Sequence, residues 1–396
     1  MAERLLIVGA SARAAAESAK RARFNPLAID QFGDRDLRRI ADVRVCERFP
    51  EEVPKLADGL PSCGLVLTGA MENHLSIVQA VAAKRPYWGC PLDAISAVRD
   101  PIRLQQTLQQ NGLPYVATRS AASMDTATGR WLKKPLKGSS GVGICMVSAE
   151  ALQDTHDACY FQRIVDGTSQ SGVFLATDAS ATLIGVTEQW IGVPWLNARP
   201  FGYAGSLGPL PLDENCRRTW QRIGEVLGQC FGLRGIFGVD AVVKHGAIHV
   251  IEINPRFPAS AEILDLAGDG RLMQYHVQAC TGSDFQMASN PDTSNHKLYH
   301  AKVIYFAPED LIVSQDLESI MDDTPRSCTS LRVADIPATG TTIRKGHPVF
   351  TLLAQHPSVD SIQRDIRRAV DRLRKFLVCC VIGTSTRRLP ESPHAR

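Results

Sequence analysis

The sequence lacks the features that mark several classes of protein. No apolar run in its 396 residues approaches the roughly 20 residues that a membrane-spanning helix needs. Its eleven cysteines form no CxxC pair and no Cys/His cluster at zinc-ligand spacing, which argues against a disulfide scaffold or a zinc module. The net charge of only +3 argues against a dedicated nucleic-acid binder. We therefore expect a reduced, cytoplasmic protein with no membrane association. The apolar run Leu5–Gly9 is too short for a signal peptide, because Arg13 follows it.

Several catalytic signatures are also missing. The sequence has no G-x-S-x-G elbow, no H-E-x-x-H helix and no Walker A loop. The turn that begins Gly9-Ala10-Ser11 is incomplete as a dinucleotide fingerprint, because Ser11 and Ala14 stand where that motif has glycines. Asp30 lies about where a ribose-binding acid would sit, so nicotinamide binding remains an alternative.

The residues that are present describe a globular α/β protein. Hydrophobic residues make up 44% and charged residues 21%, and the length suggests two to four domains. Strand-like and helix-like patterns alternate over the first hundred residues, which predicts a Rossmann-like sheet. We expect strands at Leu5–Val8, Leu27–Asp30 and Leu65–Thr68, an Ala-rich helix ending near Phe24, and an amphipathic helix over Glu72–Lys84.

Strands dominate the middle of the chain after a helix over Pro101–Asn111. The segment Ile191–Leu212 contains four prolines and four glycines, so we expect a long functional loop there. Asp213 caps a helix that runs to about Phe231. The other expected strands are Trp131–Pro135, Gly143–Val147, Phe161–Val165, Val173–Ala176, Leu183–Trp190, Gly235–Val243, Ala247–Ile253 and His300–Phe306.

An amphipathic helix is expected over Ser361–Leu377. We interpret its many arginines as a solvated outer face. A disordered tail is expected over 383–396.

A Gly/Ser loop follows a lysine-bearing strand at residues 133–144. Small residues allow backbone N–H groups to approach phosphate oxygens, and a lysine adds a point charge. A flexible hairpin explains the same pattern, so this segment alone does not show whether the loop binds phosphate. The residues in question are Lys134, Lys137, Gly138, Ser139, Ser140 and Gly141.

The strand and turn at residues 160–169 could present backbone groups to a purine, with Gln162 reading its amino group. Most such segments are only a strand and a turn, so this segment by itself is weak evidence for purine binding.

The strand pair near residues 238–256 carries the most specific pattern. Glu252 and Asn254 are two residues apart on one strand, so they project to the same face, and Asp240 on the preceding strand can reach it. Two carboxylates and an amide oxygen form a set suited to Mg²⁺. Arg256 adds a donor fork for a phosphoryl or acyl-phosphate oxygen.

In this order and spacing, the three segments resemble the ATP-grasp superfamily, of the carboxylate–amine ligase type found in stand-alone ligases related to biotin carboxylase. The motifs are Lys134-Pro135 with its Gly/Ser loop, Gln162–Val165, and Gly238-Val239-Asp240 with Glu252-Ile253-Asn254-Pro255-Arg256. The resemblance implies α/β and α+β architecture: a Rossmann-like domain over 1–98, a two-lobed ATP-grasp over 99–290, and a C-terminal α+β extension over 291–396. The small lobe would span about 113–165 and the large lobe about 166–290. Asp335–Phe350 resembles the C-terminal part of biotin-carboxylase-like members.

The resemblance also implies the cofactors ATP and Mg²⁺ (or Mn²⁺). Lys134, Lys137 and the loop residues Gly138, Ser139, Ser140 and Gly141 would contact phosphates, with Lys134 and Arg256 catalytic. Gln162, Ile164 and Val165 would contact adenine, and Asp240, Glu252 and Asn254 would hold the metal.

Two positions depart from the family pattern. Pro101 follows Asp100 where many members have a lysine, so either Arg99 or Arg103 replaces that lysine or the phosphate contact is missing. Ser169 stands where many members have a ribose-binding acid, which leaves the ribose contact open.

The implied reaction activates a carboxylate with ATP and joins it to an amine. Arg199 could hold a substrate carboxylate and Tyr203 could stack on substrate or hydrogen-bond to it, but a structural loop explains them equally well. The resemblance suggests ligation of an amino acid or glutamate in one-carbon cofactor biosynthesis, with small-molecule partners, and it permits a homodimer. Bicarbonate-dependent carboxylation and ATP binding without catalysis remain alternatives.

Overall fold

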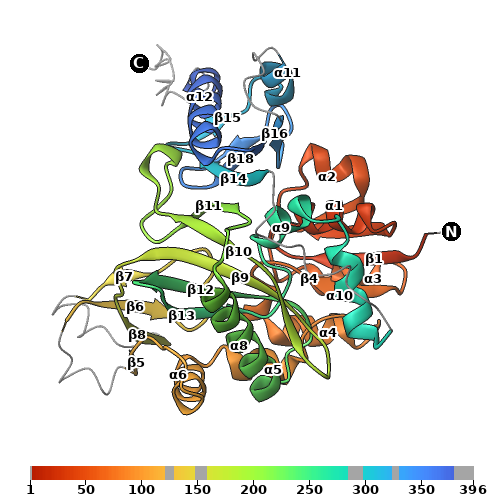
Figure 1. Cartoon of the computed structure of the whole chain (residues 1–396). Helices are drawn as coiled ribbons and strands as arrows, with labels where there is room; N and C mark the ends of the chain where they lie inside the picture. Colours follow the sequence, from red (N-terminus) through yellow and green to blue (C-terminus); the bar gives the residue numbers. More distant parts are fainter. Residues whose placement is uncertain (1, 121–128, 148–157, 284–297, 323–329, 379–396) are drawn as a thin grey trace, which may run out of the picture.

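A computed structural model describes residues 2–120, 129–147, 158–283, 298–322 and 330–378. Three sheets of four or more strands, and the helices around them, make up most of this part of the chain (Figure 1). The α/β and α+β fold class expected from the sequence is confirmed. None of the helices in these ranges is both long and apolar enough to span a membrane.

The N-terminal sheet has four parallel strands in the order β3-β2-β1-β4. Its central strand β1 is buried over Leu5–Val8, as expected for a parallel strand covered on both faces. The expected helix over Glu72–Lys84 is wrong at its start, because Ala70 takes a left-handed conformation (φ 77°) and a 3₁₀ turn follows. The elements are β1 (Arg4–Val8), α1 (Arg13–Arg21), β2 (Asn25–Asp30), α2 (Arg35–Ile40), β3 (Asp42–Val45), α3 (Val53–Asp58), β4 (Gly64–Leu67), η1 (Met71–Asn73) and α4 (Leu75–Ala82).

Two helices lead from this sheet to a small antiparallel sheet, whose strand order is β5-β8-β6-β7. Asp100 caps the second helix by accepting hydrogen bonds from the amides of Ile102 and Arg103, and Pro101 occupies its first turn. The elements are α5 (Leu92–Val98), α6 (Pro101–Gln110), β5 (Thr118–Arg119), β6 (Trp131–Pro135), β7 (Cys145–Met146) and β8 (Cys159–Arg163).

The largest sheet has eight strands in the order β13-β12-β9-β10-β11-β14-β18-β16. The Asp213 side chain accepts a hydrogen bond from the amide of Cys216 and so caps α8, as the sequence predicts. The elements up to residue 281 are β9 (Thr168–Ala176), β10 (Ala181–Ile191), η3 (Pro194–Leu196), β11 (Tyr203–Gly208), α8 (Glu214–Phe231), β12 (Gly235–Lys244), β13 (Ala247–Asn254), α9 (Ala261–Ala267) and α10 (Leu272–Thr281).

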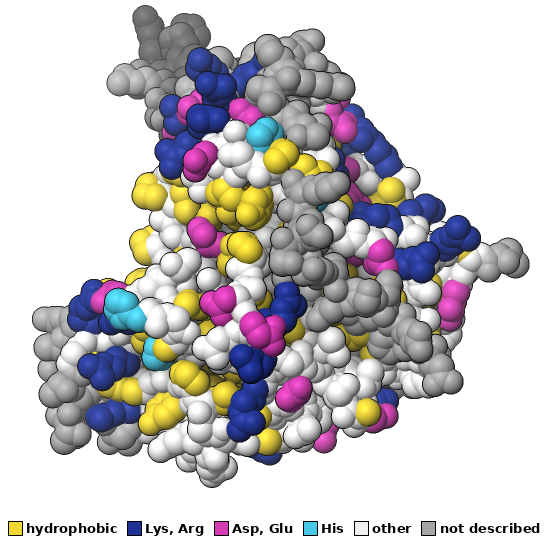
Figure 2. All heavy atoms as spheres, in the orientation of Figure 1, with side chains coloured by type: hydrophobic (Ala, Val, Ile, Leu, Met, Phe, Trp, Pro, Cys, Tyr) yellow, Lys and Arg dark blue, Asp and Glu magenta, His cyan; other side chains and the backbone are white. Residues whose placement is uncertain are grey.

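The C-terminal segment adds three strands to this sheet. Strands before and after residue 290, where the sequence predicts the end of the ATP-grasp region, therefore belong to one hydrogen-bonded sheet. α12 packs its Ile362, Ile366, Val370 and Leu373 against it, as the helical spacing predicts. On the face in Figure 2, basic side chains with some acidic ones among them cover the end where Figure 1 places α12. The elements are β14 (Tyr299–Phe306), β15 (Leu311–Ile312), α11 (Leu317–Asp322), β16 (Ser330–Ala334), β17 (Thr342–Ile343), β18 (Pro348–His356) and α12 (Val359–Val378). The tail expected over 383–396 lies outside the described residues.

The expectation of a loop throughout Ile191–Leu212 is wrong, because the buried strand β11 lies within it. A Cβ atom on Gly205 would lie 2.2 Å from the carbonyl oxygen of Lys302 on β14. The glycine therefore permits close strand pairing here and does not mark a flexible loop.

Candidate functional site

A cavity lies where the small sheet, the start of α6 and the strand β13 meet. We call it the central cavity. Residues from three separate parts of the sequence line it, including two basic side chains and one acidic side chain. Among them are Arg99, Lys134, Gly138, Ser140, Gly141 and Glu252.

The Gly/Ser loop forms one wall of the central cavity. Ser140, Gly141 and Gly143 all have positive φ angles, which Gly adopts at little cost. A Cβ atom on Gly141 would also lie 2.1 Å from the carbonyl oxygen of Phe201, so only glycine fits there. Lys137 is exposed and is not among the residues that line the cavity, whereas Ser139 is.

Lys134 projects into this region from β6 and is buried. Its Nζ donates to Oε1 of Gln162 at 3.2 Å and lies 5.5 Å from the centre of the Tyr160 ring. Both contacts are with neutral groups, so this buried ammonium group is suited to an anionic ligand.

The expected adenine segment joins the small sheet to the largest sheet. Gln162 lies near the end of β8, is buried, and donates from Nε2 to the carbonyl oxygen of Ile251 at 3.2 Å. Ile164 and Val165 follow as half-buried linker residues, and Ser169 lies on β9 opposite Val242. These four residues are not among those lining the central cavity.

The β12–β13 hairpin brings the three expected metal ligands together. Asp240 pairs directly with Glu252, and Gly238 pairs with Asn254. Nδ2 of Asn254 donates to Oδ2 of Asp240 at 2.9 Å, while Nε2 of Gln189 donates to Oδ1 at 3.0 Å. Burial, and then the neighbouring Glu252 carboxylate, raise the pKa of Asp240 to about 6. Gln189 carries no sequence signal, since it is one polar residue in a long strand.

Arg256 lies next to this hairpin in a buried hydrogen-bond network. Its Nη2 donates to Oδ1 of Asn254 at 3.0 Å, and its Nε donates to Oε1 of Glu72 at 3.0 Å. The Glu72 side chain is 1% exposed, and its Oε2 is a buried atom without a hydrogen-bond partner. The sequence does place Glu72 just after a strand of the parallel sheet, but the expected helix concealed its role.

Arg99 is the arginine that the fold brings into the central cavity. It pairs with Glu252 (2.8 Å), while Arg103 packs over the ring of Phe231 at 5.5 Å. Of the two arginines, only Arg99 is among the residues that line the central cavity, so a phosphate contact by Arg99 stays a prediction.

The two expected substrate residues do not line the central cavity. Arg199 is exposed, and the Tyr203 hydroxyl lies 2.8 Å from Oγ of Ser206. Burial raises the pKa of Tyr203. Both belong to the segment that contacts the Gly/Ser loop through Phe201.

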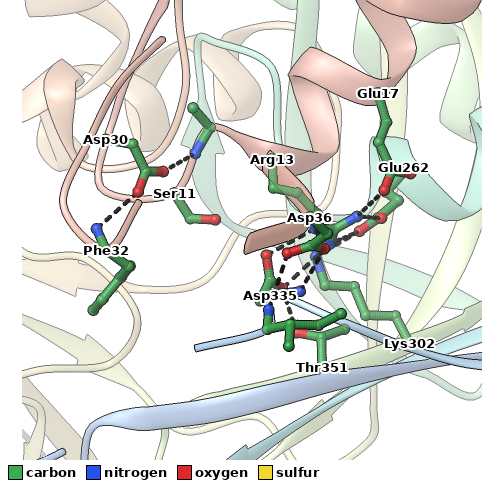
Figure 3. Close-up of polar contacts among 12 residues, drawn as sticks. Ser11, Arg13, Glu17, Asp30, Phe32, Asp36, Glu262, Lys302, Asp335 and Thr351 are labelled. Atoms are coloured by element: carbon green, nitrogen blue, oxygen red, sulfur yellow. Dashed lines mark hydrogen bonds and ion pairs between the residues drawn. The ribbon is translucent and has the colours of Figure 1, made fainter. Parts of the chain in front are cut away.

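The turn after β1 gives no support to nicotinamide binding. Asp30 is fully buried, and its carboxylate accepts hydrogen bonds from the amides of Ala12 (2.7 Å) and Gly33 (2.6 Å). It also accepts one from the amide of Phe32 at 2.7 Å (Figure 3). A carboxylate of this chain thus occupies the start of α1, where a dinucleotide phosphate would otherwise bind.

The family comparison matches residues 98–260 to the ATP-grasp domain. Among curated proteins, the chain is 27% identical over 164 residues to a formate-dependent phosphoribosylglycinamide formyltransferase of Xanthomonas axonopodis (41% of this chain, 35% of the relative). It is 24% identical over 242 residues to the carbamoyl phosphate synthase large chain of Vibrio cholerae (56% of this chain, 22% of the relative). The chain spans between 22% and 40% of the length of the curated relatives it matches.

Solved structures resemble the whole described fold. The biotin carboxylase domain of Hydrogenobacter thermophilus 2-oxoglutarate carboxylase superposes with a TM-score of 0.72 at 13% identity, covering 94% of this chain and 90% of that chain. L-amino acid ligase from Bacillus licheniformis superposes with a TM-score of 0.69 at 14% identity, covering 93% of this chain and 97% of that chain. N5-carboxyaminoimidazole ribonucleotide synthetase from Thermus thermophilus superposes with a TM-score of 0.66 at 13% identity, covering 94% of this chain and 98% of that chain. Residues 98–260 match the ATP-grasp domain, and the fold of the described residues is similar to that of these solved structures.

Proposed function

We propose that the protein is an ATP- and Mg²⁺-dependent ligase that activates a carboxylate as an acyl phosphate and joins it to an amine. One observation carries the proposal: a Gly/Ser loop with a buried lysine faces a carboxylate–amide hairpin across a single cavity. Such a pairing supports binding of a phosphate chain together with its divalent cation.

The side chains near the hairpin fit a hard divalent cation such as Mg²⁺ or Mn²⁺. Asp240, Glu252 and Asn254 offer oxygen atoms of the kind that such cations prefer. In the described ranges no group of three or more His, Cys, Asp or Glu residues could hold a metal ion, so the proposed site depends on the amide oxygen of Asn254 as well as on the two carboxylates. The raised pKa of Asp240 supports the same assignment, because it indicates a carboxylate that is short of positive charge. When bound, the cation would neutralise charge on nucleotide phosphates.

We assign the phosphates to Lys134 and the loop Gly138–Gly141, with Lys137 as an outer contact. We assign adenine to Gln162, Ile164 and Val165, and the ribose to Ser169. Their place between the small and the largest sheet supports this, since a base there would contact both lobes.

Arg256 would stabilise the charge that develops when the γ-phosphoryl group passes to the carboxylate. Its guanidinium fork is held by Glu72 and Asn254 and is 12% exposed, so little reorganisation is needed. The amine would then displace phosphate from the acyl carbon, and no covalent enzyme intermediate is required.

The substrates belong to the chemical class of small carboxylates and amines. We propose Arg199 and Tyr203 as substrate contacts, because their segment touches the phosphate loop through Phe201. Ligation of an amino acid or glutamate in one-carbon cofactor biosynthesis is the finer hypothesis. A cytoplasmic setting is supported by the free thiols of all eight cysteines in the described ranges. A homodimer stays a prediction.

Bicarbonate is a second candidate for the carboxylate. One structural neighbour is a biotin carboxylase domain in complex with MgADP and bicarbonate. Bicarbonate presents a planar CO₂⁻ group as a carboxylate does, so the same cavity chemistry would serve it.

A substrate panel read by ADP release tests the proposal. Pairs of carboxylates and amines, including amino acids, glutamate and pterin-type acids, are incubated with Mg·ATP, with and without bicarbonate. ADP formation that needs both a carboxylate and an amine supports the ligase. ADP formation that needs bicarbonate supports the carboxylase, and tight ATP binding without ADP across the panel supports a non-catalytic role.

A further inference from the structure

One turn of the N-terminal sheet contacts two parts of the site with consecutive side chains. This turn is η1, which follows β4 and carries Glu72 and Asn73. Oε1 of Glu72 accepts a hydrogen bond from Nε of Arg256 at 3.0 Å. Nδ2 of Asn73 donates to the carbonyl oxygen of Gly138 at 3.2 Å, and its Oδ1 accepts from Nη2 of Arg99 at 2.7 Å. The turn therefore contacts both the arginine beside the hairpin and the start of the Gly/Ser loop.

The N-terminal sheet holds this turn in place independently of the Gly/Ser loop. Ala70, just before the turn, has a φ of 77°, a conformation that residues other than glycine rarely adopt. The amide of Asn73 donates to the carbonyl oxygen of Ala70 at 3.2 Å, and the amide of Ala10 donates to that of Gly69 at 3.0 Å. Because the turn is fixed from the side of the sheet, it can serve as an anchor for the loop.

The Gly/Ser loop makes few hydrogen bonds to the rest of the protein. One bond within the loop joins the amide of Val142 to the carbonyl oxygen of Ser139 at 3.1 Å. Within the described ranges, the bonds that the loop makes outside itself end on the carbonyl oxygen of Gly138, which accepts from Asn73 and from Arg99, each at 3.2 Å. This carbonyl is therefore the attachment point of the loop.

The amide group of Asn73 suits both of its partners. An arginine offers only donors and a backbone carbonyl offers only an acceptor, so the amide oxygen must face Arg99 and the amide nitrogen must face Gly138. An aspartate of the same shape would still accept from Arg99. It would, however, place a carboxylate oxygen against the carbonyl oxygen of Gly138 and lose the bond to the loop.

We propose that Asn73 is a positioning residue that holds the Gly/Ser loop beside the central cavity, so that one turn sets the positions of the loop and of Arg256 together. The inference rests on the proposed function, in which the loop binds phosphates and Arg256 faces the γ-phosphoryl group. Phosphate binding then depends on the N-terminal sheet, although the phosphate contacts assigned above all lie outside that sheet.

Cleavage by a lysine-specific protease between Lys137 and Gly138 reports how often the loop leaves this place. Lys137 is exposed, and the bond adjoins the anchored carbonyl. The test compares the wild type with Asn73→Asp, without nucleotide, and quantifies by mass spectrometry the fragment that begins at Gly138. Loss of the hydrogen bond should raise this cleavage by about 2- to 10-fold. Cleavage at the exposed Lys244, at the end of β12, should not change.

Two further variants control for charge and for the loss of an asparagine. Asn73→Ala removes the donor without adding a charge, so it should raise cleavage at Lys137 within the same range. Asn111→Asp removes a similar bond, to the carbonyl oxygen of Thr107 at 2.8 Å, and should leave cleavage at Lys137 unchanged. In the ADP-release assay, Asn73→Asp should also raise the KM for ATP, whereas a mere loss of folded protein would lower only kcat.

Mg·ATP separates this inference from the proposed function. It should slow cleavage at Lys137 in the wild type, because the phosphates would contact the loop. Equal cleavage at Lys137 in wild type and both Asn73 variants, a rise that Lys244 or Asn111→Asp shares, or an unchanged KM for ATP would each overturn the inference. A wild-type protein whose cleavage Mg·ATP does not slow would instead contradict the proposed function.

Discussion

Two largely buried networks of charged and polar residues connect the N-terminal sheet to the rest of the molecule, and they differ in how far nearby cations compensate their acids. The Arg13 network joins α1 to α9, to β14 and to the segment after β16 (Figure 3). The site network joins the turn after β4 to the β12–β13 hairpin and to α5. The members of the first are Arg13, Glu17, Asp36, Glu262, Lys302 and Asp335, and those of the second are Glu72, Arg99, Asp240, Glu252, Asn254 and Arg256.

Cations compensate the central acids of the Arg13 network. The Arg13 guanidinium is 1% exposed and pairs with both oxygens of Glu262 and with Asp335 at 2.8 Å. Although burial disfavours its charged form, Arg13 and Lys302 hold the pKa of Glu262 well below its usual range. Arg13 overcomes the effect of burial at Asp335 in the same way and lowers its pKa.

The acids of the site network are only partly compensated, although Arg256 pairs with Glu72 and Arg99 pairs with Glu252. The pKa of Asp240 is raised to about 6 by burial and by Glu252, and Oε2 of Glu72 has no hydrogen-bond partner. Cations of the protein therefore compensate Glu262 and Asp335 in the first network. The second network retains an acid with a raised pKa and a carboxylate oxygen without a partner, and we expect a bound ligand to complete it.

Replacing Arg13 should have the largest effect on stability. Arg13→Met leaves the carboxylates of Glu262 and Asp335 buried with less compensation, so the free energy of unfolding should fall by about 3–5 kcal/mol. Urea denaturation measures it. Arg39→Met, which breaks a surface pair with Glu318, should cost less than about 1 kcal/mol. A similar small cost in Arg13→Met would contradict the account.

Replacing Glu252 should abolish turnover but leave stability nearly unchanged. Glu252→Ala removes a proposed metal ligand, so kcat should fall at least about 100-fold. Steady-state ADP release measures it, with the exposed Glu47→Ala as the matched control. An unchanged kcat in Glu252→Ala would refute the metal assignment.

Asp34 lies at the edge of the Arg13 network, and its titration tests whether the cations of that network also compensate this carboxylate. Burial, followed by Asp335, Asp30 and Asp36, raises its pKa to about 8. An acid with a raised folded pKa binds a proton more tightly in the folded state. Wild-type stability should therefore fall relative to Asp34→Asn as the pH rises from about 4 to about 8.

Unfolding measurements at pH 5 and pH 7 test this prediction. The difference in unfolding free energy between variant and wild type should move by about 1–3 kcal/mol in favour of the variant at the higher pH. A difference that does not depend on pH would show that Asp34 is compensated after all.

Glu72→Gln should have the smallest effect on stability. The amide retains an acceptor for Nε of Arg256 and replaces an oxygen that has no partner, so we expect a cost of about 1 kcal/mol. Thermal and urea unfolding measure it. A loss of unfolding free energy as large as that in Arg13→Met would show that Glu72 is as fully compensated as the acids of the Arg13 network. The proposed difference between the two networks would then be wrong.

The sequence predicts the regular elements of this fold well where periodicity or caps are strong. The hairpin over Gly235–Asn254 and the helix after Asp213 are confirmed. The sequence does not predict β11, because the small residues Ala204 and Gly205 have a composition typical of a loop. They are small because the strand packs closely against β14. The polar strand β3 and the short helices α2, α3 and α5 also lack a strong pattern.

The candidate site was predictable in the part that one hairpin encodes. Asp240 and Asn254 come together because strand pairing fixes their register. Glu72, Asn73 and Gln189 could not be predicted, since they reach the site through tertiary packing of distant elements. Arg199 and Tyr203 were chosen for chemistry alone, and the fold keeps them out of the central cavity lining.

The central claim is that the site forms an acyl phosphate from a carboxylate and ATP. With a substrate pair found by the ADP-release panel, the carboxylate is labelled with oxygen-18 and the released phosphate is examined by mass spectrometry. Because the amine displaces phosphate from the acyl carbon, one labelled oxygen should appear in phosphate for each ADP formed. Phosphate without the label, or AMP and pyrophosphate as products, would contradict the account.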